Sequence, residues 1–287
     1  MMELNIIALS IALAGSIIAS YTDIKTKEIP NLLTLSMIFL GLLFFTFSFY
    51  GNWIFFIPLL ASYIIIWLIW RAGMWGGGDA KLIMGLISLL SPNYGIEFIP
   101  SFFMMLAFSS LVHYFIFGMI QAMREKKGKI FAVAMVLIIT LPMLSYFLLE
   151  NVSRNIAILT SLIMFFIIGD ISSSFLPCRK KVKVSNKIVG EILAESIYIK
   201  NGKIVRIEEE PSLIIKAIKR RRIGSRGMEA LLIPKHTGIS KGEISTLKKC
   251  CDDVSIFISY PMAPIILVAL IFTILFGREM FSIIMGI

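Results

Sequence analysis

Long apolar runs separated by short polar loops make up most of this chain. A run of about 20 apolar residues is long enough to cross the hydrocarbon core of a bilayer as a helix. The pattern predicts eight membrane-spanning helices, at residues 4–21, 32–50, 53–71, 80–91, 97–121, 130–149, 155–176 and 261–277. Because the fourth run is short for a span, we expect residue 79, just before it, to lie in a water-filled cleft below the membrane surface.

One segment, 177–260, breaks the apolar pattern and predicts a small soluble domain of mixed α and β structure. Residues 196–200 and 203–207 alternate between apolar and polar side chains, which is typical of half-buried strands. Asn201-Gly202 lies between them and favours a tight type I′ hairpin turn. The sequence therefore predicts a hairpin within this segment.

Two helices are expected in the same segment. Pro211 suits the first turn of a helix that runs to about Arg222. Ser240 and Glu243 have the spacing of a capping box, which predicts a helix from there to about Cys251. The expected organisation is an all-α membrane bundle with a small α+β domain: bundle 1–176, soluble domain 177–260, and last helix with its tail 261–287.

Basic residues are concentrated on one side of this predicted topology. If the N-terminus is outside, the inner loops are 22–31, 72–79, 122–129 and 177–260. These loops and the adjoining helix ends contain all 28 Lys and Arg residues except Arg154 and Arg278. Cytoplasmic loops of membrane proteins carry such an excess. We therefore expect a multi-pass protein of the cell membrane with these loops in the cytoplasm.

Composition excludes several classes of protein. The chain of 287 residues is 57% hydrophobic and 16% charged, whereas soluble domains are about 25% charged. The cysteines Cys178, Cys250 and Cys251 have no metal-ligand spacing, and His113 and His236 are the only histidines. We therefore expect no metal and no cofactor.

A basic run at 219–222, in a chain of net charge +10, raises the question of nucleic acid. The run has no interleaved aromatic residues on which bases could stack. A basic face on a membrane-tethered domain is better suited to anionic lipid headgroups. Membrane lipids are therefore the expected partner of this face, and nucleic acid is not.

Two aspartates, Asp23 and Asp79, lie where apolar helices meet loops. Ionisable residues at a membrane boundary are costly and are functional candidates by default. Asp23 has a simpler interpretation as a helix-end residue paired with Lys25 or Lys27, and Asp79 as a plain loop residue. The topology places both aspartates on the cytoplasmic side, where two carboxyl groups can share a proton and activate a water.

The surroundings of both aspartates are distinctive. Asp23 begins an Asp-x5-Ile-Pro-Asn motif that ends at Asn31, and Gly76, Gly77 and Gly78 precede Asp79. This combination resembles the type IV prepilin and archaellin peptidases, membrane aspartyl proteases with a Gly-x-Gly-Asp motif (peptidase family A24). Residues 197–203 and 261–264 are similar to the archaeal branch.

The resemblance implies a function and a set of site residues. Asp23 and Asp79 would be the catalytic pair, acting without a metal. The enzyme would remove short basic leader peptides from pilin-like or archaellin precursors at the cytoplasmic face. Substrate-binding or supporting roles would fall to the residues around the pair: Gly76, Gly77, Gly78, Lys81, Glu28, Pro30 and Asn31.

Some of these residues have simpler interpretations. Lys81, like Lys25, is expected to anchor at lipid headgroups more than to tune the field of the aspartates. Glu28 either contacts the basic leader or is solvated. Asp170, near the end of the seventh run, is the one rival for a place in the pair, and helix packing is its expected role.

Two other classes of protein remain as alternatives. A transporter or channel could use intramembrane aspartates to bind cations, but the runs show no inverted repeat or matched broken helices. A membrane anchor with a basic partner-binding domain would leave the glycine-aspartate motif unexplained. The sequence leaves open whether the substrate is a pilin or an archaellin, and whether the aspartates meet without substrate.

Overall fold

A computed structural model describes most of the chain. The described residues are 2–71, 75–95, 97–124, 126, 128–149, 160, 164, 167–168, 179–200, 203–209, 229–235, 238–257 and 260–285. The chain separates into two compact units, Met1–Tyr114 with Tyr260–Ile287, and Phe115–Ser259.

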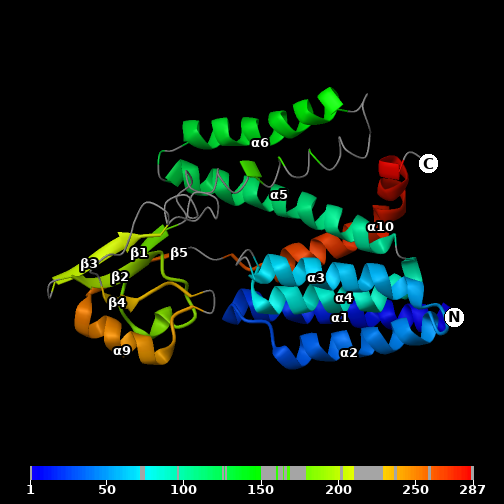
Figure 1. The fold of residues 1–287 in the computed structure, drawn as a ribbon, viewed down its shortest axis with the longest axis horizontal. Coiled ribbons are helices and arrows are strands. Elements are labelled where there is room, and N and C mark those ends of the chain that lie inside the picture. The colour runs from blue at the N-terminus through cyan, green and yellow to red at the C-terminus, as the bar shows by residue number, and fades with distance from the viewer. Residues whose placement is uncertain are drawn as a thin grey trace. The chain divides into compact units, whose positions relative to one another are not determined.

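The first unit is helical. It contains α1 (Met2–Thr26), α2 (Asn31–Ser48), the short 3-10 helix η1 (Trp53–Phe55), α3 (Phe56–Arg71), α4 (Gly77–Tyr94), the first part of α5 (Phe98–Arg124) and α10 (Ala263–Met285). In Figure 1, α1 to α4 run alongside one another. Helix α4 packs against α1, α2, α3 and α10, so it is the central helix of this unit.

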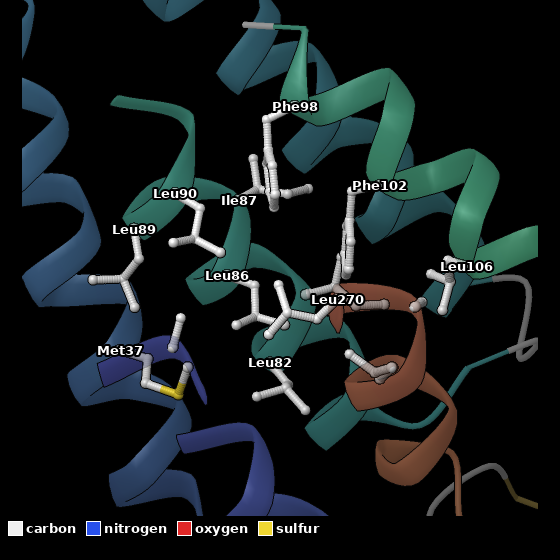
Figure 2. Close-up of a cluster of buried hydrophobic side chains, with 14 of the residues drawn as sticks. Met37, Leu82, Leu86, Ile87, Leu89, Leu90, Phe98, Phe102, Leu106 and Leu270 are labelled. Carbon is white, nitrogen blue, oxygen red and sulfur yellow. The ribbon is translucent and has the colours of Figure 1, made fainter. Parts of the chain in front are cut away.

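The core of the first unit forms around α4. Leu82, Leu86 and Leu90 on this helix are fully buried. Figure 2 shows them among Phe102 from α5 and Leu270 from α10. A helix that is apolar all round is suited to such a central place. Burial of α4 by its neighbours fixes the position of the residues in its first turn.

Small residues bring the helices around α4 unusually close. A Cβ atom on Gly41 of α2 would lie 2.6 Å from Ser88 Cβ and 2.8 Å from the backbone nitrogen of Leu89, both on α4. A Cβ on Gly85 of α4 would lie 2.9 Å from Met37 Cβ on α2. Close packing at small residues is a main source of helix association in membranes. The pairing of α2 with α4 therefore depends on these glycines.

Among the described residues, five helices are long and apolar enough to cross a membrane: Asn5–Thr26, Asn31–Ser48, Trp53–Arg71, Phe98–Arg124 and Gly128–Leu149. Ala263–Gly277 of α10 is a shorter apolar helix. The predicted run 155–176 lies outside the described residues, apart from isolated positions. The chain is therefore a mostly helical membrane protein, and eight crossings remain a prediction.

The predicted helix ends next to both aspartates were wrong. Helix α1 continues to Thr26 instead of ending at residue 21, and α4 begins at Gly77 instead of residue 80. Asp23 and Asp79 therefore lie on helical turns, not in loops. Helix α1 ends where Lys27 adopts a left-handed backbone, with φ of 58°. Apolar runs mark the buried part of a helix, whereas polar end turns follow from local capping.

The second unit contains the end of α5 and a small mixed region. Its elements are α6 (Gly128–Leu149), β1 (Arg179–Lys183), η2 (Asn186–Ile188), β2 (Glu195–Lys200), β3 (Lys203–Glu208), β4 (Glu229–Leu232), α9 (Lys241–Cys250) and β5 (Asp253–Phe257). Strands β1 and β5 form one antiparallel pair, and β3, β2 and β4 form a second antiparallel sheet in that order.

The hairpin and capping-box predictions are confirmed. Strand β2 pairs with β3 in a register that places Lys200 opposite Lys203, although the turn itself lies outside the described residues. Helix α9 begins after Ser240, whose hydroxyl accepts the backbone N–H of Glu243. The helix expected over 211–222, like the basic run within it, lies outside the described residues.

Ion pairs centred on Arg206 connect the strands of this unit. The Arg206 guanidinium on β3 lies 2.7 Å from a carboxylate oxygen of Glu195 on β2, and 3.0 Å from one of Asp253 on β5. Glu195 is buried and also accepts the backbone N–H of Ser255. Its hydrogen bond raises the pKa of Arg206 above the usual range. The buried carboxylate of Glu195 therefore has both an opposite charge and a backbone donor beside it.

Replacing Glu243 by alanine should destabilise α9 in a pH-dependent way. Its carboxylate accepts the Lys235 ammonium at 2.7 Å and the Ser240 N–H at 2.8 Å, which lower its pKa. A lowered folded-state pKa adds stability above the unfolded pKa, and this stability is lost as the pH falls through the folded value. We expect a loss of about 1 kcal/mol at pH 7 that shrinks as the pH falls through the lowered pKa of Glu243, measured by hydrogen-exchange protection of α9 amides.

The matched control for this prediction is Glu243→Gln. Glutamine can still accept the Ser240 N–H but cannot carry the charge that pairs with Lys235. It should therefore lose less protection than alanine at pH 7, and its protection should change less with falling pH than that of the wild type. Equal pH dependence in wild type and Glu243→Gln would exclude Glu243 as the titrating group.

Candidate active site

Asp23 is held in the interior of the first unit. It lies in the last turn of α1, and only 8% of the residue is exposed. Its Oδ2 accepts the backbone N–H of Ala263, the first residue of α10, at 2.9 Å. Lys25, one of the two lysines considered as its partner, donates instead to the hydroxyl of Tyr21 at 3.3 Å. The carboxyl group of Asp23 therefore points to another helix.

Asp79 lies in the first turn of α4 and is half-buried. Its Oδ2 accepts the backbone N–H of Gly76 at 3.2 Å, which satisfies a free donor at the start of the helix. Gly76 has an extended backbone that any residue adopts, with φ of −68° and ψ of 154°. The restriction is space, because a Cβ atom there would lie 2.7 Å from Asp79 Oδ2.

The two aspartates lie on helices that pack against each other. Helices α1 and α4 pack against each other, and the charge of Asp23 acts directly on the carboxyl group of Asp79. Two neighbouring carboxylates in a poorly solvated site repel each other, and a single shared proton relieves this repulsion. The arrangement can therefore supply one carboxylate and one carboxylic acid at the same place.

The two sequence motifs are also in direct contact. The Lys81 ammonium donates to the side-chain oxygen of Asn31 at 2.7 Å. Gly78 lies against Ile29, because a Cβ atom on Gly78 would be 3.0 Å from Ile29 Cβ. Lys81 was expected at lipid headgroups, and in the structure its ammonium group has a protein partner. These contacts tie the linker between α1 and α2 to the first turn of α4.

The remaining predicted site residues lie around these contacts. Pro30 is the residue before α2, and its carbonyl accepts the N–H of Thr34. The Glu28 side chain is exposed. A Cβ atom on Gly77 would be 3.5 Å from Trp70 Nε1, an ordinary contact distance. Asp170, the rival for a place in the pair, lies outside the described residues.

Sequence reasoning missed Ala263 and the packing role of Ile29. Ala263 has no functional group, so only its backbone contributes to the site. The available signal was the pair of prolines, Pro261 and Pro264, which mark a helix start close to Ala263. That signal predicts where α10 begins, but it does not say which side chain meets its first N–H group.

The described residues hold no group of three or more His, Cys, Asp or Glu side chains placed to bind a metal ion. Separately, the two carboxyl groups can act as an acid and a base.

Comparison with known proteins finds similarity in the part of the chain that contains both aspartates. Residues 10–120 match the type IV leader peptidase family, and this stretch includes both aspartates. A preflagellin peptidase of Methanococcus voltae is 34% identical over 37% of this chain and 52% of its own length. A prepilin peptidase EppA of Methanothermobacter thermautotrophicus is 35% identical over 31% of this chain and 25% of its own length.

A second prepilin peptidase EppA, of Methanocaldococcus jannaschii, is 32% identical over 46% of this chain and 38% of its own length. The chain thus matches about half the length, or less, of these curated relatives. No solved structure matches the chain significantly. The resemblance to archaeal prepilin and preflagellin peptidases, inferred from the two motifs, is confirmed for this part of the chain.

Proposed function

We propose that this protein is a membrane aspartic endopeptidase that removes the leader peptide from pilin-like or archaellin precursors. The observation that supports the proposal is the packing of α1 on α4, which sets the two motif aspartates near enough for the charge of one to act on the other. The names of the curated relatives support the choice of substrate class.

The proposed reaction uses the pair as one base and one acid. The ionised carboxylate takes a proton from a water molecule while the water oxygen bonds to the carbonyl carbon of the leader junction. The carboxylic acid gives its proton to the carbonyl oxygen, which produces a tetrahedral diol. The first carboxyl group then protonates the amide nitrogen, the C–N bond breaks, and a diol hydroxyl returns a proton to the second carboxylate.

The membrane setting suits this substrate class. A pilin-like precursor joins a short basic leader to a long apolar helix. We propose that the apolar helix lies along the membrane bundle, so that the junction meets the aspartates at the cytoplasmic face. The described apolar helices support a place in the membrane.

Incubation of membranes containing the protein with several candidate precursors tests the proposal. Mass spectrometry should detect two products, a short basic leader and a mature chain with a new N-terminus. A transporter or channel, the competing class, would instead move cations across sealed vesicles and leave every precursor intact. Intact precursors across a panel of pilin-like and archaellin substrates would refute the peptidase proposal.

Cysteine labelling should place the polar loops on two sides of the membrane. Cysteine at Glu28 or Lys129, both exposed, is expected to react with an impermeant maleimide only from the cytoplasmic side, because basic loops stay inside. Cysteine at Tyr50, also exposed, should react only from outside. Labelling of position 129 from outside would remove one crossing and contradict the eight-span topology.

A further inference from the structure

We infer that Lys81 is a positioning residue: by binding Asn31 at the start of α2, it fixes the separation of Asp23 and Asp79. The inference rests on the proposed peptidase function and adds a residue that acts on the pair through the backbone. It depends on one hydrogen bond, from Lys81 Nζ to Asn31 Oδ1 at 2.7 Å, between residues 50 positions apart in the chain.

The Lys81 side chain extends from α4 toward α2 and away from Asp79. Successive residues of an α-helix are rotated by about 100°, so residues two positions apart lie on nearly opposite sides. Gly85, one turn after Lys81 and on the same side of α4, lies against Met37 of α2. Lys81 therefore continues the side of α4 that packs on α2, and any effect on Asp79 passes through the helix.

Asn31 is placed to bind a second helix and not to cap its own. Asparagine is one of the preferred N-cap residues, but the N-cap position of α2 is occupied by Pro30. Asn31 is the first residue of the helix, and its backbone carbonyl accepts the hydroxyl of Thr34 at 3.2 Å. Its side-chain oxygen accepts the Lys81 ammonium on α4.

A short path of bonds joins the two aspartates through this contact. The backbone carbonyl of Asp23 accepts the N–H of Lys27 at 2.9 Å, and three residues separate Lys27 from Asn31. Asn31 is bound to Lys81, which follows Asp79 by two positions on the same helix. Because three residues leave little slack in the chain, a shift of the start of α2 also moves the end of α1.

Two contacts limit the position of the linker in opposite directions. The packing of Ile29 against Gly78 limits how closely the linker approaches α4. The Lys81–Asn31 hydrogen bond limits how far it moves away, because such a bond weakens steeply with distance and angle. Without the bond only the steric limit remains, so the linker and the end of α1 that carries Asp23 can move outward from Asp79.

A double-mutant cycle between Lys81 and Asn31 tests the inference, with cleavage of a pilin-like precursor measured in nanodiscs. Lys81→Met keeps an unbranched apolar side chain and removes the donor. We expect kcat to fall about tenfold, as for a displacement of about half an ångström, with KM within about twofold of wild type. Asn31→Leu removes the acceptor but keeps the charge of Lys81, and should give the same loss.

The double variant should also lose about tenfold and not about a hundredfold, because both changes remove one bond. Lys81→Arg keeps a donor and should retain more activity than Lys81→Met. Amounts of protein in the membrane and thermal stability should stay close to wild type. If Lys81→Met does not accumulate, the kcat of Asn31→Leu decides alone.

The matched control is Lys25→Met, which removes an exposed lysine that donates to Tyr21 on its own helix. Its kcat should stay within about twofold of wild type. Wild-type kcat in Asn31→Leu would show that Lys81 acts by its charge alone and would overturn the inference. A raised KM with unchanged kcat, or losses that multiply in the double variant, would also overturn it. Failure of the peptidase proposal looks different, because the wild-type protein would then cleave no precursor.

Discussion

Asparagine in place of Asp79, or of Asp23, is expected to reduce leader cleavage by at least about a hundredfold and up to about ten-thousandfold. This is the usual range for loss of a general acid or base. The physical reason is that one member must carry a proton while the other does not, and an amide side chain does neither. Cleavage of a pilin-like precursor in membranes, followed by mass spectrometry, measures the effect.

The fold should survive both changes. At position 23 the asparagine side-chain oxygen can still accept the Ala263 N–H, and at position 79 it can still accept the Gly76 N–H. Amounts of protein in the membrane and thermal stability in detergent should therefore stay close to wild type. Near wild-type cleavage by either variant would refute the assignment of the pair.

Two other carboxyl groups supply the controls. Glu28→Gln changes an exposed side chain on the same linker and should leave cleavage within about threefold of wild type, since exposed substitutions seldom matter structurally. Asp170→Asn should also retain activity, because only Asp23 and Asp79 belong to the two motifs. Complete loss on changing Asp170 would reopen the choice of partner for Asp23 or Asp79.

The second large effect is expected at Gly78. Alanine there would place a Cβ atom 3.0 Å from Ile29 Cβ, so the linker and the first turn of α4 must separate by a few tenths of an ångström. Small displacements of catalytic groups lower rates strongly, by about a hundredfold for 1 Å. We expect Gly78→Ala to lower kcat about tenfold with little change in KM, because the shift moves Asp79 relative to Asp23.

Gly77 provides a control on the same turn. Alanine at this position would meet Trp70 Nε1 at 3.5 Å, which requires no movement. Gly77→Ala should therefore keep kcat within about threefold of wild type. Equal losses at the two positions would show that the requirement for glycine is not set by Ile29. A raised KM with unchanged kcat in Gly78→Ala would instead assign this glycine to substrate docking.

A structure-based explanation of the glycines differs from the one that the sequence suggested. The family resemblance implied a substrate-binding or supporting role for all three glycines. In the structure, Gly78 has a protein neighbour, Ile29, and Gly76 is restricted by Asp79 itself. The two explanations predict different variants as the sensitive ones, so the comparison of Gly77 with Gly78 separates them.

The sequence by itself determined the features that depend on local physical chemistry. The apolar runs predict helices wherever their length and hydropathy suffice, and α2, α3, α5 and α6 appear close to the expected ranges. Alternation around Asn201-Gly202 predicts the β2–β3 pairing, and the Ser240 capping box predicts α9. These signals are local because a capping box, a hairpin turn and an apolar run each depend on neighbours within a few residues.

Only the tertiary structure decided which distant residues meet. Asp23 contacts Ala263, Lys81 contacts Asn31, and Gly78 packs against Ile29, three contacts between segments far apart in the chain. No local pattern encodes them, since they follow from the packing of α1, α2 and α10 around α4. Two motif aspartates can be recognised in the sequence, but the difference between their environments arises only when the last helix presents its free N–H group to one of them.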